Sequence, residues 1–224
     1  MVEDPSELRN IIDETDWLAL KGSSKSLFDL DTPDMLRGLV SSDVREVEMG
    51  LSHLVFGLGD GVNVMPATVP AVRYVLALLP RIPGETAMRP RVSGIRKPLR
   101  AHLLEWLGDT ADAVSDDSER RFVDLAGFSP LKYPASPWHK VRQLRPQIFE
   151  VVSAFLEDQD PVTRREAIAA AVVLVRGTEL AAHRDAVAVS TQAFLDASPD
   201  PAQRNWATSA LEELRRPRPS EAEQ

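Results

Sequence analysis

Two basic stretches contain the side chains best suited to recognise another molecule. Residues 89–100 carry five basic side chains and no acid, and residues 132–148 carry four more with aromatic rings between them. Arginine combined with aromatic rings is typical of nucleic-acid grooves and of hot spots in protein interfaces. The alternative is a solvated loop whose aromatic rings cover the core. The candidate partner-binding residues are Arg89, Arg91, Arg96, Lys97, Arg100, Tyr133, Trp138, His139, Lys140, Arg142 and Arg145.

Catalytic and metal-binding patterns are missing from the sequence. The four histidines are scattered, no His-Glu-x-x-His or Gly-x-Ser-x-Gly pattern occurs, and there is no cysteine. Gly57, Gly59 and Gly61 follow a predicted helix rather than a strand, which indicates a helix end and not a phosphate loop. We therefore expect no catalytic residue, no metal site and no cofactor. Paired carboxylates are expected to be solvated at helix ends or in loops: Asp109 and Asp112, Asp116 and Asp117, Asp158 and Asp160.

Composition narrows the class of protein and of partner. Hydrophobic residues at 43% and charged residues at 27% of the 224-residue chain predict an ordinary globular protein that folds without disulfides. The acidic N-terminus lacks the features of a secretory signal, and no apolar stretch approaches 18 residues, so we expect a cytoplasmic protein without a membrane partner. The net charge of -8 favours a basic protein partner and disfavours nucleic acid.

The elements that must position these residues all have a helical period. Apolar side chains recur at three- and four-residue steps in residues 44–58, 69–79, 99–107, 141–155 and 168–175, and no strand pattern competes with them. Thr32-Pro33, Asp160-Pro161 and Asp200-Pro201 each place an N-cap oxygen before a proline suited to the first helical turn. These three dipeptides predict helix starts.

The last two helix starts indicate an internal repeat. Asp160 and Asp200 lie 40 residues apart, and identical residues continue beyond the caps at the same offset, including Arg164 with Arg204. This period is typical of HEAT and armadillo arrays, in which two helices form each unit, and the second helix here is expected near residues 179–197. A generic helical bundle with local Asp-Pro caps is the alternative.

The sequence therefore predicts an all-α fold, namely an α-solenoid of stacked antiparallel helix pairs with no sheet. Residues 1–216 are expected to form a single domain. Prolines and glycines predict irregular loops near residues 80–98 and 115–137, and residues 217–224 are expected to be a disordered tail.

Residues 33–79 and 138–216 resemble a family of small actinobacterial HEAT-repeat proteins. The resemblance rests on Val44-Arg45 and its helix, on the alanine- and proline-rich segment 66–72, and on the Asp160 and Asp200 units. A histidine-glutamine-glycine turn is usual where this chain has Gly59-Asp60-Gly61. The resemblance implies that Asp160, Arg164, Asp200, Arg204 and Arg45 are structural, with the aspartates and arginines bonded between neighbouring units.

The resemblance also implies function, since members of this family are suspected to be binding proteins, some of them immunity proteins that neutralise toxins. We expect a non-catalytic protein that binds another protein. The alternative is a nucleic-acid-binding protein similar to the HEAT-like alkylpurine DNA glycosylases. These enzymes resemble this chain in architecture, but none of their residue motifs occurs in it.

Overall fold

The computed structural model describes residues 6–20, 31–58, 64–83 and 88–216. Helices account for most of them, so the predicted all-α class is confirmed. The first half contains α1 (Ser6–Glu14), α2 (Trp17–Leu20), α3 (Thr32–Gly38), α4 (Val44–Gly57), α5 (Thr68–Leu78) and the 3₁₀ turn η1 (Leu79–Arg81). The second half contains α6 (Leu99–Ala113), α7 (Asp116–Ala126), η2 (Pro130–Lys132), α8 (Pro137–Ser153), α9 (Pro161–Leu174), η3 (Thr178–His183), α10 (Arg184–Ala197) and α11 (Pro201–Arg215).

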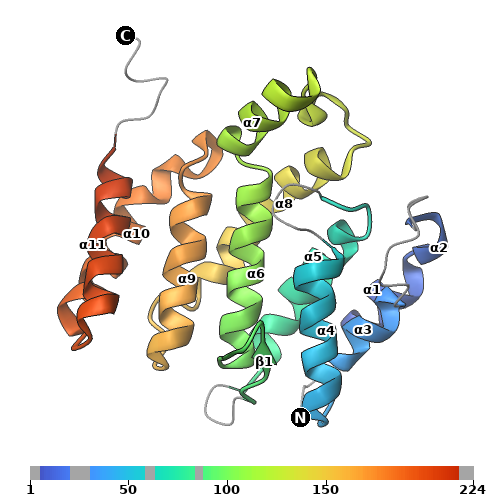
Figure 1. The fold of residues 1–224 in the computed structure, drawn as a ribbon, viewed down its shortest axis with the longest axis horizontal. Coiled ribbons are helices and arrows are strands. Elements are labelled where there is room, and N and C mark those ends of the chain that lie inside the picture. Colours follow the sequence, from blue (N-terminus) through green and yellow to red (C-terminus); the bar gives the residue numbers. More distant parts are fainter. Residues whose placement is uncertain (1–5, 21–30, 59–63, 84–87, 217–224) are drawn as a thin grey trace.

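Four helices run side by side across the molecule. Figure 1 shows α4, α6, α9 and α11 standing next to one another, with α5, α8 and α10 behind them. Helix α6 packs most extensively against α9, α8 contacts both, and α10 packs between α9 and α11. The apolar stripes predicted from the sequence face inward here, as Val47, Leu103 and Ile168 show by their complete burial. One hydrophobic core thus runs along the whole array.

Capping side chains set the predicted helix starts. The Asp160 carboxylate accepts hydrogen bonds from the backbone N–H groups of Val162 (3.1 Å) and Thr163 (2.8 Å), and Asp200 accepts one from Ala202 (2.9 Å). Both helices continue with proline, whose missing N–H costs nothing at this position. The prediction at Thr32 was wrong in detail, because Asp31 holds the N-cap position there. The hydroxyl of Thr32 lies instead 3.0 Å from Nε2 of His53.

A small sheet corrects the prediction that the fold has none. Strands β1 (Arg91–Val92) and β2 (Ile95–Arg96) pair antiparallel within the predicted irregular segment 80–98. Ser93 and Gly94 connect them with φ values of 52° and 81°, the left-handed backbone that a tight two-residue hairpin turn requires. Such short strands carry no periodic signal that a sequence pattern can detect.

The predicted irregular loop 115–137 also contains a regular element. Helix α7 begins after Ser115, whose hydroxyl accepts from the Ser118 N–H at 3.2 Å, and ends at Gly127 with φ 77°. Acidic side chains in its first turn suit the positive end of the helix dipole. The ring centroids of Phe122 in α7 and Trp138 in α8 lie 5.2 Å apart, and this contact packs α7 against α8. Asp116, Asp117 and Glu119 therefore belong to the first turn of a helix rather than to a loop.

Three further expectations have different outcomes. The second helix predicted near residues 179–197 is present as η3 followed by α10. The segment Gly59-Asp60-Gly61 and the tail 217–224 lie outside the described residues. Within the described parts of the chain, no helix is long and apolar enough to cross a lipid bilayer.

Candidate functional site

The basic side chains of residues 89–100 mostly form ion pairs within the protein. Arg89 lies 3.2 Å from the Asp160 carboxylate, and Arg100 lies 3.1 Å from Asp158. The Arg100 guanidinium also stands over the ring of Phe155, 5.2 Å from its centroid. These contacts link the start of α6 and the segment before it to the turn before α9. Two arginines that have no acidic neighbours in the sequence therefore pair with acids far along the chain.

Lys97 is the most deeply buried of these cations. Its Nζ donates to Glu105 of α6 and to Glu166 of α9, both at 2.9 Å, and only 8% of the residue is exposed. Burial lowers the pKa of Lys97, but the hydrogen bonds and negative charges of Glu105 and Glu166 outweigh it and raise the pKa overall. Lys97 is therefore a charged structural link between α6 and α9.

Arg145 plays a similar structural role in α8. It is 1% exposed and donates to the carbonyl oxygens of Ala111 (3.4 Å), Val173 (3.3 Å) and Leu174 (2.8 Å). Its Nε lies 3.0 Å from the Glu179 carboxylate. Burial lowers the pKa of Arg145, and Glu179 partly offsets the effect. One guanidinium thus joins the C-terminal ends of α6 and α9 to α8 and η3.

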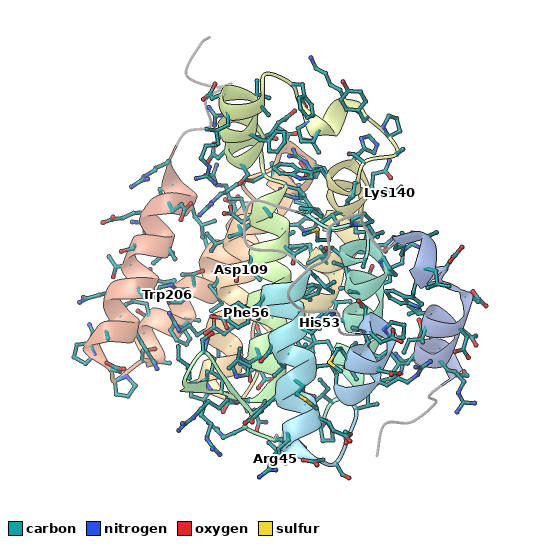
Figure 2. The ribbon with its side chains drawn as sticks, turned by 45° about the vertical axis from the view of Figure 1, so that its right-hand side comes forward. Arg45, His53, Phe56, Asp109, Lys140 and Trp206 are labelled. Carbon is teal, nitrogen blue, oxygen red and sulfur yellow. The ribbon has the colours of Figure 1, made fainter. Side chains whose placement is uncertain are left out.

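The other predicted residues of this stretch divide between the interior and the surface. Trp138 is buried, Arg142 donates to the Val114 carbonyl at 2.8 Å, and His139 lies with Nδ1 2.8 Å from the Leu131 carbonyl oxygen. Tyr133 and Lys140 remain exposed, and Figure 2 shows Lys140 at the edge of the molecule.

Five of the predicted partner-binding residues therefore remain exposed: Arg89, Arg91, Arg96, Tyr133 and Lys140. The structure does not gather them into one basic and aromatic groove, because Arg91 and Arg96 belong to the hairpin whereas Tyr133 and Lys140 lie beside α7 and in α8.

The predicted structural residues stabilise their own turns. Arg164 donates through Nε to the Asp158 carbonyl at 2.8 Å, and Asp160 caps its own helix and pairs with Arg89. Among the described residues, the Arg45 and Arg204 side chains make no hydrogen bond or ion pair, and Arg164 bonds to a backbone carbonyl rather than to an aspartate side chain. The ladder that the family resemblance implies for these arginines does not appear in the described contacts. Other arginines, namely Arg89 and Arg100, pair with Asp160 and Asp158 instead.

A row of acids on α6 is the more distinctive feature, and two of its members, Asp109 and Asp112, are among the carboxylates that the sequence predicts to be solvated. Glu105, Asp109 and Asp112 are spaced by four and three residues, so they share one face of the helix. Glu105 bonds to Lys97, and Asp112 lies 3.4 Å from Arg176. Within the described residues Asp109 has no hydrogen-bond or ion-pair partner. We call these three residues the α6 acidic row.

The electrostatic surroundings of Asp109 make its charge costly. Partial burial of the carboxyl raises its pKa to about 6, and the charges of Glu105, Asp112 and Glu166 contribute in the same direction. Asp109 nevertheless keeps solvent-exposed surface. It lies within α6 and not at the helix end expected from the sequence. Of the three carboxylates in the row, Asp109 is the one without an ion-pair partner among the described residues.

Aromatic side chains lie on the helices on either side of the row. Trp206 of α11 is half-buried, packs edge-on against Phe194 at 5.7 Å, and holds the Arg165 guanidinium 5.1 Å from its ring centroid. Phe56 of α4 is 55% exposed. Figure 2 labels Asp109, Phe56 and Trp206, which come from three of the four side-by-side helices. These helices therefore present a mixed acidic and aromatic face.

In the described part of the chain, no group of three histidine or carboxylate side chains is placed to share a metal ion.

No family model matches the chain, and neither a curated protein nor a solved structure matches it.

Proposed function

We propose that this chain is a non-catalytic HEAT-like repeat protein that binds another protein through the face formed by α4, α6, α9 and α11. The observation that carries the proposal is the unpaired carboxylate of Asp109 among carboxylates that are bonded. A carboxylate whose pKa is raised by burial and by like charges, and which has no hydrogen-bond or ion-pair partner among the described residues, is a candidate for a binding site.

The arrangement of the helices supports a solenoid as the scaffold. Helices α6 and α9 are each followed by a helix of the second layer, α8 and α10, and α11 continues the first layer. Solenoids of this kind use the surface of one layer to hold an extended partner. The repeated Asp-Pro caps of α9 and α11 agree with this interpretation.

The charge distribution favours a basic partner. The whole chain carries a net charge of -8, and long-range attraction steers a basic protein toward it. Asp109 then offers a specific point of contact for a lysine or arginine. An immunity protein that covers the basic active site of a toxin is the specific version of this proposal, and it belongs in the cytoplasm.

A nucleic-acid partner has less support. Binding duplex DNA requires several cations aimed at phosphates. Lys97, Arg100 and Arg145 are instead held in internal ion pairs, so they are not available for phosphate contacts.

The proposal is tested with charge reversal on two exposed aspartates. Asp109→Lys should abolish retention of a basic partner, whereas Asp124→Lys on α7 should not, because Asp124 is exposed outside the proposed face. Equal retention by both variants would contradict the assignment of the face.

A further inference from the structure

A cavity of about 470 Å³ opens on α4 beside the β1–β2 hairpin. Its apolar walls are Met49 and Phe56, which are 49% and 55% exposed, together with the backbone of Gly57. Ligand cavities in proteins typically have volumes of roughly 300–1,000 Å³ and mostly apolar walls. The cavity therefore has the size and lining of a small-molecule site.

The inner surface of the cavity is uncharged. His53 lines it and is 6% exposed, with Nε2 placed 3.0 Å from the Thr32 hydroxyl. Burial lowers the pKa of His53, and the nearby charge of Asp31 only partly offsets this effect. The imidazole is consequently neutral near pH 7 and adds a polar but uncharged group to the apolar walls.

The charged lining residues, as far as the structure describes them, are two arginines and one glutamate. Arg45 and Arg91 line the cavity, both exposed, and within the described residues neither guanidinium has a hydrogen-bond or ion-pair partner. Glu48 is the acid in the lining, and its Oε1 accepts from the backbone N–H of Arg91 at 2.7 Å. Among the described lining residues, two guanidiniums therefore outnumber one carboxylate.

The hairpin adds an independent sign of unbalanced charge. Arg91 and Arg96 are directly opposite each other across the two strands, on the same face. Like charges in opposed positions destabilise a strand pair. Arg96 is exposed and also lacks a side-chain partner among the described residues. An anion bound beside Arg91 would relieve this repulsion.

We propose that this cavity binds a small organic anion with an apolar body, such as a medium-chain carboxylate. The apolar body lies against Met49 and Phe56, and the anionic group faces Arg45 and Arg91. None of the α6 acidic row lines this cavity, although Phe56 belongs both to the cavity wall and to the proposed protein-binding face. The inference does not depend on the protein partner proposed above.

The experiment uses the full chain and 8-anilinonaphthalene-1-sulfonate, a fluorescent anion with an apolar body. We expect one saturable site from which decanoate displaces the probe. Decyltrimethylammonium, which has the same chain length and the opposite charge, should displace it at least about tenfold less effectively, because a charge-assisted contact contributes about this factor. Equal displacement by both competitors, or the absence of a saturable site, would overturn the proposal.

Variants then locate the site. Phe56→Ser and Arg91→Gln should each weaken probe binding by about tenfold. Phe128→Ser and Arg73→Gln are the matched controls, since Phe128 is 48% exposed on a different part of the surface and Arg73 is exposed on α5. All four side chains are exposed, so circular dichroism should show an unchanged fold. Unaltered binding in both cavity variants, or an equal loss in the controls, would contradict the assigned location.

Discussion

Gly108 of α6 and Ala170 of α9 touch so closely that a Cβ atom on Gly108 would lie 3.1 Å from both the Cα and the Cβ of Ala170. This contact lets the two helices pack tightly along their length, and the Lys97 bridge between Glu105 and Glu166 fastens the same pair. Helices α6 and α9 therefore form a rigid centre for the face that carries Asp109.

Gly108→Val should lower the free energy of unfolding by about 1–3 kcal/mol, because overpacking forces the two helices apart. Urea unfolding followed by circular dichroism measures the effect. Ala193→Val is the matched control, since Ala193 is exposed on α10. Valine at that position should lower the free energy of unfolding by only about 0.5 kcal/mol, because it forms helix less readily than alanine. A loss in Gly108→Val no larger than in the control would show that the contact is not tight.

Arg145→Ala should lower the free energy of unfolding by about 3 kcal/mol. The substitution leaves three buried carbonyl oxygens without this donor and removes the closest cation from Glu179. Lys140→Ala on the same helix should change stability by less than about 0.5 kcal/mol, because Lys140 is exposed. Chemical denaturation of both variants compares them directly, and similar small losses would contradict the structural role of Arg145.

Asp109→Asn should stabilise the protein at pH 7.5 but not at pH 3.5. The pKa of Asp109 is about 6 in the folded chain, whereas its ordinary value is 3.8. Between these two pH values the folded chain therefore binds more protons at Asp109 than the unfolded chain does. The contribution of Asp109 to stability therefore falls as the pH rises from about 4 to 6. Solvent exposure reduces the size of the effect. Urea midpoints of both proteins across this range measure it, and a difference independent of pH would contradict the raised pKa.

Much of the fold could be predicted from sequence because its signals are local. Apolar side chains at helical spacing and the Asp-Pro caps at 160 and 200 located α4, α8, α9 and α11. Helix α7 was not predicted because Pro130, Pro134 and Pro137 indicate a loop over the whole segment, although Ser115 and the acids after it are suited to a helix start. The hairpin was missed because two-residue strands have no detectable period.

The candidate site was much harder to predict, because it depends on contacts between distant residues. Lys97 and Arg145 appeared unpaired in the sequence, yet their partners Glu166 and Glu179 lie 69 and 34 residues away. In the sequence, Asp109 is one of several carboxylates that are all predicted to be solvated. Its distinction appears only when α6 and α9 pack and its neighbours form their own bonds.

The wild-type chain should not bind duplex DNA at about 50 mM salt. Phosphate contacts make binding strongest at low salt, so this condition favours detection of a nucleic-acid partner. The exposed Arg91 and Arg96 of the hairpin lie on a different element from Lys140 of α8, so the two predicted basic stretches do not form one groove. Fluorescence anisotropy with a labelled duplex provides the measurement, and a steeply salt-dependent complex would favour the nucleic-acid alternative.

Affinity capture with three immobilised baits tests the proposed binding face most directly. Wild type, Asp109→Lys and Asp124→Lys are incubated with a lysate of the organism that encodes the protein, and bound proteins are quantified by mass spectrometry. We expect a stoichiometric basic protein on the wild-type and Asp124→Lys baits, and we expect it to be lost from the Asp109→Lys bait. The absence of any stoichiometric partner, or equal retention by Asp109→Lys, would contradict this prediction.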